Sequence, residues 1–119
     1  MENKLIGYAN LSDAVIIEVQ YIYPGYDDES SQKKVRVVVD CVNTNQKWER
    51  IALDFESVSS FFFKEGKATN QIIDEIKIEP LQDGKFIFDF SQGDFIGSEY
   101  VSDFFLVFTV LSVTVLKSL

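Results

Sequence analysis

The chain has 119 residues, 46% of them hydrophobic, and its 19 Asp and Glu residues oppose 11 Lys and Arg residues to give a formal charge of −8. A chain of this length is expected to form one domain over residues 1–119 without disulfides or metals, and its charge disfavours binding to nucleic acid or to an anionic membrane. With no His and one Cys, the sequence excludes a Ser-His-Asp triad, an imidazole metal site and an internal disulfide. Residues 1–7 lack the pattern of a signal peptide, so we expect a cytoplasmic protein.

The first half of the chain predicts three strands. Residues 1–12 have no clear period and fit either one short helical turn or a strand. Alternation of apolar and polar residues then predicts strands over Ala14–Tyr23, Lys34–Val42 and Lys47–Phe55. Pro24-Gly25 ends the first strand, and the turn residues Asn43–Gln46 join the other two into an antiparallel hairpin.

The second half predicts shorter strands and a hairpin. Val58–Phe63 is a further extended segment, and Asn70–Ile76 fits a helical turn that passes into a strand by Glu75. The dipeptide Asp83-Gly84 between alternating segments predicts a type I′ turn, with Phe86–Phe90 as its second arm. Residues 91–103 are interpreted as a loop.

The most apolar stretch is Phe104–Leu116. Split by parity, both of its sides are mainly apolar, and the run is rich in β-branched residues and lacks Gly and Pro. We therefore predict one buried central strand, in a sheet covered on both faces.

Together these segments predict a mainly β domain. We expect an antiparallel sheet, sandwich or half-barrel of about six to eight strands, with at most one or two short helical turns.

No motif for catalysis, metal binding or cofactor binding occurs, and we expect no cofactor. Cys41 lies in phase with the apolar face of its strand and is interpreted as a core residue. Asp40 and Asp54, on neighbouring strands, are the candidate pair for acid–base chemistry on a glycoside, although acids on a solvated sheet face are routine. The cluster Asp27-Asp28-Glu29 lacks the spacing of a calcium-binding loop.

Several spaced positions resemble small bacterial immunity proteins of polymorphic toxin systems. The resemblance covers about residues 11–115. It rests on Leu11-Ser12-Asp13-Ala14, Ile51-x-Leu53-x-Phe55-x-x-Val58, Asn70-x-Ile72-Ile73-x-x-Ile76-x-Ile78 and the Asp-Gly hairpin. It implies a non-enzymatic inhibitor that binds a toxin domain of the same bacterium and covers its active site.

Under this hypothesis the contact surface is an acidic loop with aromatic anchors. Its candidate residues are Tyr23, Tyr26, Asp27, Asp28 and Glu29. Carboxylates there would attract a basic toxin domain, and exposed tyrosines are typical binding anchors. The aromatic residues Tyr21, Trp48 and Tyr100 fit either a binding face or the margin of the core.

Two other functions remain open from the sequence. The first is a structural β domain that forms a homodimer through an exposed strand edge. The second is a small carboxylate-dependent enzyme or carbohydrate binder, which would need a pocket that holds two acids.

Overall fold

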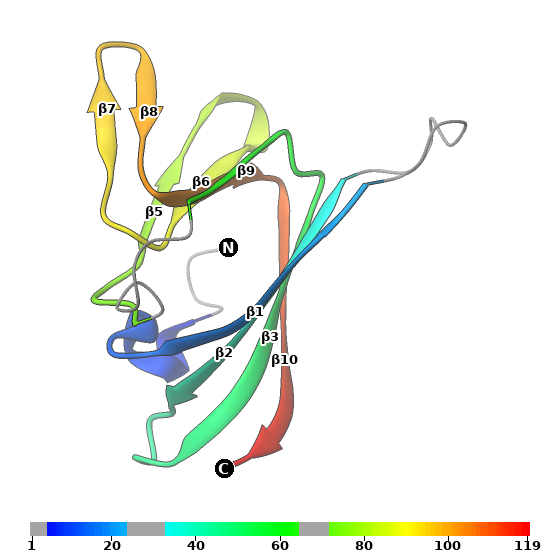
Figure 1. Ribbon diagram of the computed structural model, residues 1–119, viewed down its shortest axis with the longest axis vertical. Coiled ribbons are helices and arrows are strands. Elements are labelled where there is room, and N and C mark those ends of the chain that lie inside the picture. Colours follow the sequence, from blue (N-terminus) through cyan, green and yellow to red (C-terminus); the bar gives the residue numbers. More distant parts are fainter. Residues whose placement is uncertain (1–4, 24–32, 65–71) are drawn as a thin grey trace.

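The computed structural model describes residues 5–23, 33–64 and 72–119, and within these ranges the chain is mainly β, as predicted (Figure 1). Every strand pair is antiparallel. The elements in chain order are η1 (Ile6–Leu11), β1 (Val15–Ile22), β2 (Lys34–Val42), β3 (Trp48–Glu56), β4 (Ser60–Phe63), β5 (Lys77–Pro80), η2 (Gln82–Gly84), β6 (Phe86–Asp89), β7 (Asp94–Ile96), β8 (Glu99–Val101), β9 (Phe104–Phe108) and β10 (Val110–Ser118).

The first sheet has the strand order β1-β2-β3-β10. The predicted β2–β3 hairpin is confirmed, and its register places Val35, Val37 and Val39 opposite Phe55, Leu53 and Ile51. All six side chains are buried, as is Cys41. Their alternation with polar residues is what makes these two strands readable from sequence.

The second sheet has the order β4-β9-β6-β5, and β7 and β8 form a separate two-stranded ribbon. Phe55 of the first sheet links the two sheets, because its ring meets those of Phe88 and Phe108 edge-on with centroids 5.0 Å apart. Such edge-to-face contacts favour aromatic cores. The buried cluster also takes Leu5 and Leu11 from the N-terminal segment, so one core serves both sheets.

The predicted single strand Phe104–Leu116 is wrong. The extended segment is interrupted at Thr109. Before it, β9 is an inner strand of the second sheet; after it, β10 is an edge strand of the first (Figure 1). In β9 the buried residues are even-numbered, from Phe104 to Phe108, whereas in β10 Leu111 is buried and its even-numbered neighbours are exposed. Because β9 buries even-numbered residues and β10 buries an odd-numbered one, a single strand over Phe104–Leu116 has apolar residues on both sides.

The remaining predictions have mixed outcomes. The N-terminal segment is helical over Ile6–Leu11, which was one of the two alternatives. Asp83 and Gly84 both have positive φ, 63° and 74°, as a type I′ turn requires. The helical turn left open at Asn70–Ile76 does not form over residues 72–76, and the strand expected by Glu75 begins at Lys77 as β5, while Asn70 lies outside the described residues. Instead, Ile73 exchanges backbone hydrogen bonds with Asp13 and Ala14. Pro24 also lies outside the described residues.

Candidate functional site

The β7–β8 hairpin stands away from the rest of the molecule (Figure 1). The side chains of Phe95, Ile96 and Val101 are 43%, 70% and 46% exposed. Large apolar side chains concentrated on a projecting ribbon of two three-residue strands are unusual for a surface that meets only water. This hairpin is therefore the first place to look for a contact surface.

A buried carboxylate anchors the base of the hairpin. Asp89, at the end of β6, has no exposed surface. Its Oδ1 accepts hydrogen bonds from the Ser91 backbone N–H (2.8 Å) and the Ser102 hydroxyl (2.5 Å). Its Oδ2 accepts from the Gly93 N–H and the Tyr100 hydroxyl, both at 2.6 Å. Ser91 and Gly93 lie before β7, whereas Tyr100 lies in β8 and Ser102 follows it. One carboxylate therefore binds both ends of the hairpin, which we call its legs. We call these five residues the Asp89 anchor.

Close packing reinforces the anchor at Gly93. A Cβ atom there would lie 2.1 Å from the Val101 carbonyl oxygen and 2.4 Å from the Ser102 Cβ. Glycine is therefore required by the approach of the two legs, not by its φ angle.

Lys77 of β5 closes the anchor from the side. Its ammonium donates to the Gly93 carbonyl oxygen (3.2 Å), lies 3.0 Å from a Glu79 carboxylate oxygen and sits 5.8 Å from the centroid of the Tyr100 ring. The hydrogen bond with Glu79 is the main reason that the pKa of Lys77 is raised. Burial, followed by the hydrogen bond to Asp89, raises the pKa of Tyr100. Tyr100 therefore remains a proton donor, and Lys77 a cation, throughout the neutral range.

Aromatic rings connect the hairpin to the outer face of the second sheet. The ring centroids of Phe95 and Tyr100 are 5.0 Å apart, those of Tyr100 and Phe105 are 5.0 Å apart, and those of Phe105 and Phe62 are 6.2 Å apart. We call these four residues the aromatic corner. Its two ends, Phe62 and Phe95, are 48% and 43% exposed. The corner offers a partner a rigid apolar surface, because its rings pack against one another and against the anchored hairpin.

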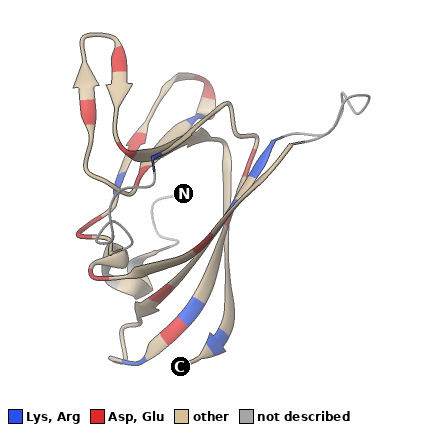
Figure 2. Cartoon of the chain, in the orientation of Figure 1, with Lys and Arg blue, Asp and Glu red and all other residues tan. Residues whose placement is uncertain are grey.

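The acidic excess of the chain is concentrated in the stretch of sequence that contains the hairpin. Residues 72–103 contain eight carboxylates and two lysines, so this segment carries −6 of the total formal charge of −8. Both strands of the hairpin bear acids, Asp94 and Glu99 (Figure 2). An apolar patch bordered by negative charge is complementary to a basic partner.

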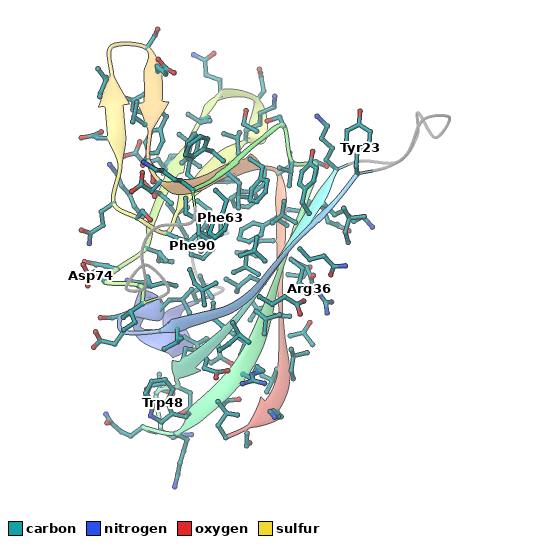
Figure 3. The ribbon with its side chains drawn as sticks, in the orientation of Figure 1. Tyr23, Arg36, Trp48, Phe63, Asp74 and Phe90 are labelled. Carbon is teal, nitrogen blue, oxygen red and sulfur yellow. The ribbon has the colours of Figure 1, made fainter. Side chains whose placement is uncertain are left out.

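The surface predicted from sequence is described only in part. Tyr23 follows β1 and is 63% exposed, with the Lys33 ammonium 5.6 Å from its ring centroid (Figure 3). Tyr26, Asp27, Asp28 and Glu29 lie outside the described residues. Tyr21 instead covers the margin of the core, since its ring stacks on Phe61 at 5.2 Å.

The candidate catalytic pair Asp40 and Asp54 does not converge. Each carboxylate accepts hydrogen bonds from the Nε and Nη2 atoms of an arginine on the neighbouring strand, Asp40 from Arg50 and Asp54 from Arg36. In the β2–β3 register the two aspartates are four positions apart, or about 13 Å at the usual rise of a strand. The hydrogen bond from Arg50 lowers the pKa of Asp40, so this carboxylate serves as an ion-pair partner and not as a proton donor.

Cys41 is a core residue, as predicted. Its side chain has no exposed surface, and burial is the main reason that its pKa is raised to about 12. The thiolate needed for nucleophilic or metal chemistry is therefore scarce at neutral pH.

Sequence reasoning missed the hairpin because it interpreted residues 91–103 as a loop. A signal was present: Phe95-Ile96 and Tyr100-Val101 flank Gly97-Ser98-Glu99, and Gly97 adopts a positive φ of 64°. Strands of three residues give too little alternation to be recognised alone. The burial of Asp89 carries no local signal, because it depends on contacts with residues up to 13 positions away.

Comparison with known proteins gives no assignment: the chain matches no protein-family model, no curated protein and no solved structure. None of the helices in residues 5–23, 33–64 and 72–119 is long and apolar enough to cross a membrane.

Proposed function

We propose that this protein is a non-enzymatic protein-binding module whose contact surface is the aromatic corner together with the β7–β8 hairpin. The observation that carries the proposal is the pairing of exposed apolar side chains with a buried anchor that fixes their position. A preorganised surface loses little conformational entropy on binding, which favours affinity.

The expected partner is a basic protein domain. Carboxylates outnumber lysines by eight to two in residues 72–103, and a field of this sign speeds association with a positive surface. The spaced positions that resemble immunity proteins support a more specific form of the proposal, in which the partner is a toxin domain and binding covers its active site. Such a pair would act in the cytoplasm of the producing cell.

The test is a titration against the product of a neighbouring gene, if that gene encodes a toxin domain. Ile96→Ser should weaken binding at least about tenfold, because it removes the most exposed apolar side chain of the hairpin. The matched control is Ile17→Ser, which removes an isoleucine that is 46% exposed on β1. Equal affinities of these two variants would exclude the hairpin as the contact surface.

Charge is tested in the same titration. Glu99→Gln should slow association and reduce its dependence on salt, whereas Glu18→Gln on β1 should not. Binding that does not weaken as salt rises would contradict a basic partner. Neutralising Asp27, Asp28 and Glu29, or replacing Tyr23 with Ala, distinguishes the surface predicted from sequence from the hairpin.

A neighbouring gene that encodes no toxin domain would remove the immunity hypothesis but not the proposed surface. The homodimer alternative concerns a different part of the molecule, the free edges of the sheets.

A further inference from the structure

The two four-stranded sheets end in four edge strands, and three of them carry features that block further pairing. In the described part of the chain these edge strands are β1, β4, β5 and β10. The start of β1 is already bridged by Ile72 at Val15, and its register is irregular between Ile16 and Glu18. β4 and β5 have four residues each, and β5 contains two charges and ends at Pro80. Bulges, charge, proline and short length are the usual protections of an exposed edge.

β10 lacks these protections over most of its length. It is nine residues long, and its pairing with β3 is regular from Val110 to Val115, with the irregularity only beyond Val115. Residues 110–116 contain no charge, no Gly and no Pro. Val110, Val115 and Leu116 are 43%, 51% and 45% exposed. Figure 1 shows β10 along the outer margin of the first sheet.

We infer that β10 is a homodimerisation edge, at which the β10 strands of two copies pair antiparallel across a two-fold axis. An unpaired strand edge presents a row of N–H and C=O groups whose complement is another strand. Because residues 110–116 are uncharged, the β10 strands of two copies can pair without charge repulsion between them. A two-fold axis lets each copy use the same surface. The product is a continuous eight-stranded sheet made of two four-stranded ones.

The alternation of β10 restricts the register. Because paired residues must lie on the same face of the sheet, the axis passes through either Ser112 or Val113. With the axis through Ser112, the Ser112 residues of the two copies are directly opposite, at about 5 Å. With the axis through Val113, they are diagonal neighbours at about 7 Å. Ser112 is exposed on the outer face, so its substitution leaves the core untouched.

The interface is small. Pairing over six residues buries less than the roughly 1,200 Å² of a standard interface, so we expect a dissociation constant on the order of 10 μM. This inference does not depend on the proposed function, because the β7–β8 hairpin contacts the second sheet through Tyr100 and Phe105, whereas β10 belongs to the first sheet.

Sedimentation velocity of the full chain across this concentration range tests the dimer. The wild-type protein should shift from monomer to dimer as concentration rises, and Ser112→Lys should remain a monomer because two ammonium groups would face each other. Ser12→Lys is the matched control, since Ser12 is exposed between η1 and β1, and it should dimerise like the wild type.

A cross-link checks the position of the axis. Ser112→Cys should form a disulfide-linked dimer on mild oxidation, whereas Ser12→Cys should not, and the buried Cys41 does not compete. A wild-type protein that is monomeric at all concentrations would overturn the inference. So would a dimer that survives Ser112→Lys, or one that is lost in Ile96→Ser.

Discussion

The outer face of the first sheet and the segment around the hairpin use charge in opposite ways. On the first sheet Lys34, Arg36 and Arg50 each pair with a carboxylate of the neighbouring strand. In residues 72–103 acids outnumber bases by eight to two, and the most highly bonded acid, Asp89, is buried without a cation among its hydrogen-bond partners. The first arrangement makes a neutral solvated face, whereas the second fixes an acidic projection.

The comparison predicts that the two regions contribute differently to stability. Exposed ion pairs contribute little because water competes with them, whereas a buried carboxylate that accepts from four donors cannot be removed without leaving most of those donors unpaired. The hairpin should therefore depend on a few residues, and the first sheet on many.

The largest effect is expected for Asp89→Ala. Removing the carboxylate leaves two backbone N–H groups and the Ser102 hydroxyl without an acceptor and the Tyr100 hydroxyl with only the Gly93 carbonyl oxygen, at a cost of about 3 kcal/mol in the free energy of unfolding. Denaturant unfolding measures this cost, and hydrogen exchange should show protection lost first in β7 and β8. Asp83→Asn, an exposed acid in the same segment, is the control and should change stability by less than about 0.5 kcal/mol. Similar stabilities for the two variants would contradict the anchor.

Gly93→Ala is next, with an expected loss of about 2 kcal/mol, because a methyl group would collide with the Val101 carbonyl and Ser102. Gly7→Ala supplies the matched control, since a Cβ at Gly7 has no atom within 4 Å. Thermal unfolding of both variants is sufficient, and equal midpoints would show that the hairpin legs can separate freely.

Tyr100→Phe should cost about 1 kcal/mol, since the ring still packs on Phe105 while one hydrogen bond to Asp89 is lost. Double-mutant analysis with Asp89→Ala would show coupling if the two groups act as one unit. Additive losses would mean that the hydroxyl acts independently of the carboxylate.

The smallest effect is expected on the first sheet, from Asp40→Asn. The pKa of Asp40 is lowered in the folded protein, so its contribution is present above the unfolded pKa of about 3.9 and is lost as pH falls through the folded value. The variant should lose less than about 1 kcal/mol at neutral pH and show a weaker decline in stability below about pH 4. Unfolding measured from pH 7 to pH 2 checks the slope, and a larger loss than that of Asp89→Ala would reverse the comparison.

The first sheet was more readable from sequence than the second for a physical reason. β2 and β3 are nine residues long with one wet face, so their alternation is clear, and both strands were predicted almost to their ends. The second sheet is made of strands of four or five residues, and its outer face is partly covered by the hairpin, which conceals alternation. The burial of Asp89 could not be predicted, because the residues that donate hydrogen bonds to it come later in the chain.

The candidate site shows the same limit. Charge and aromatic content predicted an acidic binding surface at Tyr23 and the loop around Asp27, most of which lies outside the described residues, and they gave no sign of Phe95 and Ile96. Exposure of an apolar side chain is a property of the folded surface, and no local pattern distinguishes an exposed Phe from a core Phe in a chain with eleven of them.

Thr109 alone separates two strands that bury residues of opposite parity. Exchange of its side chain leaves that phase change in place, whereas an insertion or deletion of one residue would turn the inward row of β9 or β10 out to water. Homologues are therefore expected to conserve the number of residues between β9 and β10 more strictly than the residue type at Thr109. A homologue with a different number here should have a rearranged sheet.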